Sequence, residues 1–353
     1  MNIIKIDRVY MKIRLLFFIF ITFILTSCFH EDNFENSKKG NFEALWTIFD
    51  QKYCFFEYKK DFVDWDEVYT RYSARVEEEM TDEEFFYVMG EMLNELKDGH
   101  VNLVAKHDRI RYLAWFEDYP KNFDANIQEK YYLGTGTDYR ISGGIKYRIL
   151  EDNIGYLYYG DFSISTSLSQ LDHIIKYLMP CDGIIVDVRN NGGGALTNSE
   201  RLAERFFKEK TLVGYIQHTT GKGHDSFSKP YAQYITPPND RLRYQGPVVV
   251  LTNRSSYSAT NDFVNSMRYA PNAVIVGDKT GGGSGLPFSS EIPNGWSVRF
   301  SASPIHDASM EHIEFGIDPD LFVDMDTNLR EIDTIIETAR KVIKNEIQVN
   351  KKR

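Results

Sequence analysis

The sequence predicts an α/β protein in which a small helical bundle precedes a largely parallel sheet. Three short runs rich in β-branched residues, at 184–188, 248–252 and 273–277, are typical of strands that are covered on both faces. The first two runs lead through turns into segments with apolar residues at helical spacing. Strands that alternate with helices favour a sheet with helices packed on its faces.

The helical bundle is expected within residues 41–105, where apolar and aromatic residues recur at helical spacing in three segments. These segments are residues 42–49, 64–72 and 81–96. The last one opens at Thr81 with Glu84 three residues later, which is the spacing of a capping box. It stops before His100, and residues 101–104 predict a short strand.

The rest of the chain divides into three parts. Residues 106–145 are mixed and polar, and we expect an irregular connecting segment there. Residues 146–325 carry the strand and helix patterns of the α/β domain, interrupted at 211–246 by a long polar excursion with one candidate strand. Residues 326–353 end the chain, with a helix expected over 327–345.

The N-terminus has the features of a targeting segment. Lys12 and Arg14 precede an apolar stretch that is short for a spanning helix and ends at Cys28. Residues 1–28 end in LTSC, which resembles a bacterial lipobox. The resemblance implies cleavage before Cys28 and a lipid on the thiol of Cys28. Residues 29–40 would be the tether of a protein anchored by that lipid, at the cell envelope of a Gram-negative-type bacterium. The alternative is an uncleaved membrane anchor.

Composition narrows the possible partners and cofactors. The formal net charge of −10 over 353 residues argues against nucleic acid. Cys54 and Cys181 are too few for a disulfide framework, and we expect both to be buried free thiols. No spacing of cysteine and histidine predicts a zinc site, and the glycines at 281–285 lack the lysine and hydroxyl residue of a phosphate-binding loop. We therefore expect neither a metal nor a cofactor.

Two loops at strand ends could carry a reaction. The three glycines at 192–194 follow the first buried strand, and glycines leave backbone amides unshielded. Ser258 lies between the second buried strand and a helix, so the amide of Ala259 would lie at a helix N-terminus. Each loop also has a plainer interpretation, the first as a tight turn and the second as a helix cap. Together they resemble half of an acyl-transfer site.

Five short motifs occur in the order found in the tail-specific, or C-terminal processing, serine peptidases. They are LKDGH at 96–100, IIVDVRNNGGG at 184–194, SYSAT at 256–260, GDKTGG at 277–282 and EFGIDPD at 314–320. The chain resembles the branch of that family that includes the tricorn protease core, over about residues 41–325. The resemblance implies a crotonase/ClpP-like spiral β-sheet core with helices. Many relatives insert a PDZ domain, but residues 106–145 are too few for one, so none is expected.

The resemblance also implies roles for single residues. Ser258 would be the nucleophile, and the amides of Gly193 and Ala259 would form the oxyanion hole. His100 matches the histidine base of the tricorn-like branch, and histidine can act as a base and then as an acid near neutral pH. Glu314 in the final motif would orient or polarise this relay.

The chain departs from the family pattern at two positions around the base. The processing branch uses a lysine that would align with Gly283, so a serine–lysine pair here would have to use Lys279. The tricorn-like branch has a serine beside the histidine that links it to the glutamate, and this chain has Gly99 there. Glu314 would then reach His100 through water or contribute little.

The sequence as a whole predicts a membrane-anchored serine endopeptidase that hydrolyses exported or extracellular polypeptides. One competing hypothesis is a non-catalytic peptide- or ligand-binding lipoprotein on the same fold. Another is a peptidase whose base is Lys279.

Overall fold

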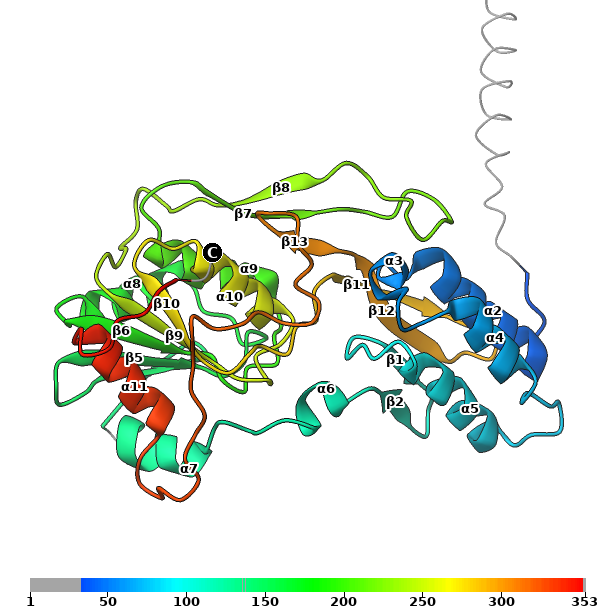
Figure 1. Cartoon of the computed structure of the whole chain (residues 1–353), viewed down its shortest axis with the longest axis horizontal. Helices are drawn as coiled ribbons and strands as arrows, with labels where there is room; N and C mark the ends of the chain where they lie inside the picture. Colours follow the sequence, from blue (N-terminus) through cyan, green and yellow to red (C-terminus); the bar gives the residue numbers. More distant parts are fainter. Residues whose placement is uncertain (1–32, 135, 137, 352–353) are drawn as a thin grey trace, which may run out of the picture.

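The computed structural model describes residues 33–134, 136 and 138–351, which form two bodies joined by long segments (Figure 1). One body holds the large sheet and its helices, and the other holds the first helices and a smaller sheet. The expected signal segment and Cys28 lie outside the described residues. Within the described part of the chain, no helix is both long and apolar enough to cross a bilayer.

The large sheet has the strand order β14-β10-β9-β6-β5-β4-β3. Its strands are β3 (Arg140–Ser142), β4 (Ile145–Ile149), β5 (Ile154–Tyr159), β6 (Gly183–Asp187), β9 (Val248–Thr252), β10 (Ala273–Gly277) and β14 (Leu321–Phe322). Neighbouring strands are parallel from β5 to β14, while β3 and β4 are antiparallel at one edge. Every residue of β6 and β9 is buried, as their β-branched runs predict.

Helices cover both faces of this sheet. They are α7 (Ala125–Ile127), α8 (Leu168–Leu178), α9 (Leu196–Ala203), α10 (Ala259–Arg268) and α11 (Thr334–Ile343). Helices α8, α9 and α10 share one apolar cluster with Ile184 and Val186, whereas α7 and α11 share another with Ile185. Successive strand residues point to opposite faces, so the two clusters lie on opposite sides of the sheet. The predicted α/β class with a preceding helical unit is confirmed.

The second body combines the N-terminal helices with strands from far along the chain. Its elements are α2 (Lys38–Lys52), α3 (Phe56–Lys59), α4 (Trp65–Ser73), α5 (Asp82–Asn94), β1 (Asn102–Val104), β2 (Arg109–Arg111), β11 (Leu286–Glu291) and β12 (Ser297–Ser303). Helix α5 begins with the predicted capping box of Thr81 and Glu84. The sheet order is β11-β12-β1-β2, and Asn102 lies opposite Arg299. Residues 286–303 therefore complete the helical unit, and they bring β12 beside the segment that follows α5.

A third sheet has the strand order β13-β7-β8. Its strands are β7 (Thr211–Ile216), β8 (Tyr231–Ile235) and β13 (Ile305–Asp307). The hairpin of β7 and β8 extends along the top of Figure 1 from the large sheet toward the other body, and α6 (Ala114–Glu117) lies in the connection below. The polar excursion expected over 211–246 is thus a long hairpin with a strand in each arm. Short turns of helix at Gln128–Leu133 and Glu204–Phe206 complete the elements.

The C-terminal helix is shorter than expected. The sequence predicts it over 327–345, but α11 begins only at Thr334. The carboxylate of Asp333 accepts hydrogen bonds from the amides of Ile335 and Ile336, so this residue caps the helix and fixes its start.

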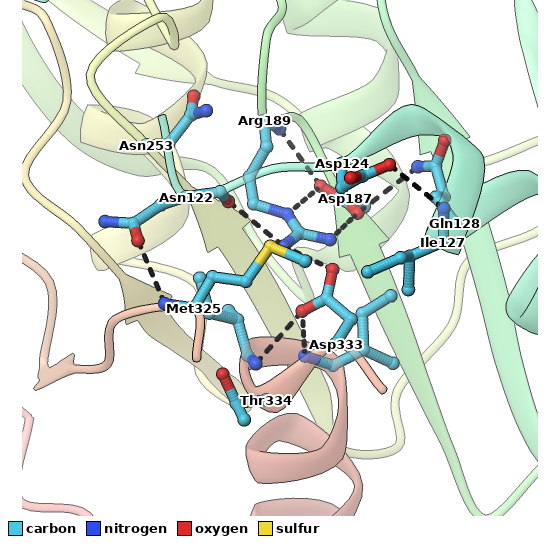
Figure 2. Close-up of polar contacts among 12 residues, drawn as sticks. Asn122, Asp124, Ile127, Gln128, Asp187, Arg189, Asn253, Met325, Asp333 and Thr334 are labelled. Carbon is cyan, nitrogen blue, oxygen red and sulfur yellow. Dashed lines mark hydrogen bonds and ion pairs between the residues drawn. The ribbon is translucent and has the colours of Figure 1, made fainter. Parts of the chain in front are cut away.

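The side chain of Asp333 also belongs to a buried cluster around Arg189, which Figure 2 shows. The Arg189 guanidinium donates to both carboxylate oxygens of Asp187, at 2.9 and 2.6 Å, and to Asp333 Oδ2 at 2.8 Å. The carbonyl of Asn122 accepts a further bond of 3.3 Å. All three charged side chains are fully buried, and the single guanidinium pairs with both carboxylates. The cluster fixes the end of β6, directly before the glycine turn, to the start of α11.

Candidate active site

Ser258 lies at a strained turn between β9 and α10. Its backbone has φ 57° and ψ −122°, a conformation that is costly for a residue with a side chain. The Ser258 amide donates to the Gly282 carbonyl at 2.9 Å, which holds the turn in place. Its hydroxyl makes no hydrogen bond to the start of α10. The interpretation of Ser258 as a helix cap is therefore wrong, and its hydroxyl is available for another partner.

That partner is His100, which is 158 residues away in the sequence. His100 Nε2 lies 3.0 Å from Ser258 Oγ, and His100 Nδ1 lies 3.2 Å from Ser301 Oγ on β12. The Ser301 hydroxyl donates to the Ser284 carbonyl at 3.3 Å, so its oxygen can accept from Nδ1–H. This arrangement places the imidazole proton on Nδ1 and leaves Nε2 as the acceptor that faces Ser258. The ring is buried, and burial lowers the pKa of His100 to about 4.

Glu314 acts at a distance from the histidine. One carboxylate oxygen accepts the Ser284 amide at 2.9 Å, and the other contacts Lys59 Nζ at 3.2 Å. Glu314 thus holds the backbone of Ser284, whose carbonyl accepts the hydroxyl of Ser301. Glu314 is therefore linked to His100 through Ser284 and Ser301. The expectation that Glu314 reaches His100 through water, or contributes little, is replaced by this link through two serines.

Lys59 is a fully buried cation, and no pattern in the sequence predicts it. Its ammonium donates to Tyr53 Oη at 2.8 Å, to the Leu96 carbonyl at 3.0 Å and to Glu314. Asp98 accepts the Tyr53 hydroxyl at 2.9 Å and the His100 amide at 2.7 Å. Burial raises the pKa of Glu314, and Asp98 adds to this effect while Lys59 opposes it. The network joins α3 to the loop that carries the histidine.

Lys59 and Ser301 gave no signal in the sequence. Lys59 lies in a mixed aromatic and charged stretch, in which a lysine is ordinarily exposed. Ser301 lies on β12, outside the five motifs that carry the family resemblance. Its approach to His100 depends on the pairing of β1 with β12, which no local pattern indicates.

Two glycines explain the departures from the family pattern. A Cβ atom at Gly99 would lie 2.4 Å from Trp115 Nε1 and 2.8 Å from Tyr257 Oη, so a serine does not fit beside the histidine. At Gly283, where φ is +73°, a Cβ atom would lie 2.2 Å from the Tyr257 ring, so a lysine does not fit there either. Lys279 instead pairs with Asp318 at 3.7 Å.

The glycine turn lies directly against the nucleophile. A Cβ atom at Gly193 would meet Ser258 Cβ at 2.8 Å, so only glycine permits this approach. The Gly193 amide donates to Asn191 Oδ1 at 3.0 Å and is not free in this conformation. Among the described residues, the amides of Gly194 and Ala259 have no hydrogen-bond acceptor. The turn thus offers Gly194 as a second possible donor beside the expected Gly193.

Ser258 borders two cavities. One of about 330 Å³ is lined by the starts of α9 and α10, by the segment 283–287, and by Arg299 on β12, Ile305 on β13 and Ile313. The other, of about 610 Å³, is lined by His100, the glycine turn and β2. Arg299 borders both. A peptide bound across Ser258 could therefore place its side chains in both cavities, one on each side of Ser258.

The remaining predictions about cysteines and metals can be compared with the described residues. Cys54 and Cys181 are both buried free thiols, as expected. In the part of the chain that the structure covers, no group of three or more histidine, cysteine, aspartate or glutamate side chains could hold a metal ion.

The site of this α/β protein has a serine on a strained strand-to-helix turn, 3.0 Å from the ring nitrogen of a buried histidine, an arrangement in which a histidine can activate a serine as a nucleophile. Comparison with known proteins identifies its family. The Peptidase family S41 profile matches residues 153–323, and the profile of the Tricorn protease C1 domain matches residues 34–94. A crystal structure of a "putative peptidase" from Parabacteroides merdae is 52% identical, with a TM-score of 0.83, over 88% of this chain and 97% of that one. The chain belongs to peptidase family S41, a family of serine peptidases.

More distant relatives agree with this assignment. A carboxyl-terminal-processing protease from Synechocystis is 26% identical over 49% of this chain and 38% of its own length. The chain spans less than two fifths of the length of this relative and of one from Picosynechococcus. The structure of mature CPAF shares the fold, with a TM-score of 0.66 at 10% identity over 89% of this chain.

Proposed function

We propose that this protein is a serine endopeptidase that hydrolyses exported or extracellular polypeptides, with Ser258 as nucleophile and His100 as base. The observation that carries the proposal is the 3.0 Å contact between His100 Nε2 and Ser258 Oγ at a strained turn. Its two adjoining cavities give room for substrate side chains on both sides of the nucleophile. Membership of family S41 supports the same reaction class.

The histidine performs both proton transfers. Nε2 accepts the Ser258 proton as Oγ attacks the scissile carbonyl, and it then protonates the leaving amine. The imidazole is neutral at pH 7 because burial lowers its pKa to about 4. Asp98 raises that pKa and so favours the imidazolium that forms in the transition state. Ser301 keeps the Nδ1 proton in place, and Glu314 supports Ser301 through Ser284.

The oxyanion is bound by backbone amides. The Ala259 amide is free at the N-terminus of α10, where the helix dipole favours negative charge. The second donor comes from the turn at 192–194. Gly193 would exchange its bond to Asn191 for the oxyanion, and Gly194 is the alternative donor. Water then hydrolyses the acyl-enzyme with His100 as base.

The test is hydrolysis of an unstructured protein such as casein, together with labelling by a fluorophosphonate probe. Ser258→Ala should abolish both, and His100→Ala should slow both by several orders of magnitude. His173→Ala serves as the control because His173 is exposed on α8. Full activity in His100→Ala with loss in Lys279→Ala would assign the base to Lys279. A folded wild-type protein that neither cleaves nor labels would support the non-catalytic binding hypothesis.

We further propose that the mature chain is anchored by a lipid on Cys28 at the bacterial cell envelope. The support is the sequence pattern of residues 12–28. Growth with a labelled palmitate analogue should tag the wild-type protein in the membrane fraction. Cys28→Ser should remove the tag, and a tag that persists in this variant would contradict the anchor.

A further inference from the structure

The cavity of about 330 Å³ beside Ser258 combines apolar walls with a carboxylate. Its apolar walls are formed by Leu196, Leu286, Ile305 and Ile313. Asp262 on the first turn of α10 lines the same cavity. The Asp262 amide donates to the Ser258 carbonyl at 3.1 Å, so the carboxylate lies one helical turn from the nucleophile.

Asp262 has no partner for its charge. Within the described residues, its carboxylate has no hydrogen-bond donor and no ion pair, although the side chain is partly buried. The hydroxyl of Ser284, which also lines the cavity, is buried without a hydrogen-bond partner. Buried polar groups without partners are costly, and near a nucleophile they indicate a ligand that supplies the missing partner.

The surrounding charges do not neutralise Asp262. Glu200 on α9 is the nearby charged group that acts on it, and burial together with this like charge raises the pKa of Asp262 to about 6. Arg299 on β12 borders the same cavity, but within the described part of the chain Glu200 is the charged group that acts on Asp262, and Arg299 is not. The cavity therefore retains a carboxylate that is ionised at pH 7 and faces apolar walls.

The direction of the reaction decides which part of the substrate enters this cavity. His100 delivers a proton to the leaving amine, and His100 lines the other cavity but not this one. The leaving group therefore lies on the side of His100. In the proposed reaction, the acyl part bonded to Ser258 would then have its side chain in the cavity that Asp262 lines.

We propose that this cavity binds the side chain of the residue whose carbonyl is attacked, and that Asp262 selects lysine or arginine there. The inference rests on the proposed peptidase function. The apolar walls suit the methylene stem of these side chains, and the carboxylate suits the cationic end. Ser284 Oγ gives the cation a second acceptor.

The experiment compares fluorogenic peptides that differ only at this residue, with lysine, norleucine or glutamate. At pH 8 the lysine peptide should have a kcat/KM about 10- to 100-fold above that of norleucine, the range of one charge-assisted hydrogen bond. Asp262→Asn should bring lysine to the level of norleucine and change the norleucine rate little. Glu200→Gln, which removes a nearby carboxylate outside the cavity lining, should keep the preference.

A pH profile gives a second readout that a structural effect would not produce. The lysine preference should disappear as the pH falls through about 6, because Asp262 is then protonated, while hydrolysis of the norleucine peptide continues. Equal rates for lysine and norleucine in the wild-type protein would overturn the inference. A preference for glutamate that is lost in Arg299→Ala would also overturn it, and would show that the cavity binds carboxylates.

Labelling by a fluorophosphonate separates this inference from the proposed function, because the probe does not need the substrate side chain. Labelling of Ser258 without a lysine preference overturns only the inference about Asp262. Absence of labelling and of hydrolysis of every peptide, in folded protein, overturns both.

Discussion

Replacing Ser301 by alanine removes the hydrogen-bond partner of His100 Nδ1 and tests how the base is held. The wild-type contact is 3.2 Å and lies in a fully buried site. Loss of a neutral hydrogen bond costs about 0.5–1.5 kcal/mol, and a buried donor left without a partner costs about 1–3 kcal/mol. If this free energy is lost from the orientation of the His100 ring in which Nε2 faces Ser258, kcat should decrease by about 5- to 100-fold with little change in KM.

The assay for Ser301→Ala is steady-state hydrolysis of one peptide together with the rate of fluorophosphonate labelling. Ser303→Ala is the matched control, because Ser303 lies on the same strand and its hydroxyl contacts His218 at 3.1 Å and not His100. Both variants should unfold at similar temperatures. A Ser301→Ala enzyme as active as Ser303→Ala would show that Ser301 does not position His100.

Three further predictions follow from the buried groups of the site. Burial lowers the pKa of His100 to about 4 from an ordinary 6.5. The value of kcat/KM for a neutral peptide should therefore stay constant as the pH falls and decrease only below about pH 4. A decrease that begins near pH 6.5 would contradict this. Lys59→Met leaves two buried carboxylates uncompensated and should lower the free energy of unfolding in urea by about 3–5 kcal/mol, whereas exposed Lys60→Met should change it by less than about 0.5 kcal/mol. Gly99→Ser introduces the serine found in the tricorn-like branch, but its side chain would clash with Trp115. This variant should therefore react more slowly with the fluorophosphonate probe. Unchanged labelling would show that the loop around residue 99 can move to make room for the side chain.

The sequence predicted those parts of the fold that depend on local patterns. The buried strands at 184–188 and 248–252 follow from β-branched runs, and the capping box at Thr81 follows from spacing. The start of α11 was harder to predict. Asp333 is both a cap and a partner of Arg189, and the second role comes from residues distant in the sequence.

The candidate site divides in a similar way. Ser258 and His100 stand in recognisable motifs, and the structure places them 3.0 Å apart. Ser301 could not be predicted, because its contact with His100 requires β12 to pair with β1, a strand about 200 residues earlier, in a sheet separate from the large one. Lys59 could not be predicted either, because only the tertiary arrangement surrounds its ammonium with Glu314 and Tyr53.

The most direct test of the central claim is the location of a fluorophosphonate adduct by peptide mass spectrometry. If Ser258 is the nucleophile and His100 its base, a single adduct should form on Ser258, rapidly in the wild-type protein and far more slowly in His100→Ala. No adduct on the folded wild-type protein would contradict the claim that Ser258 is an activated nucleophile. An adduct on another serine, such as the neighbouring Ser256, would contradict it as well.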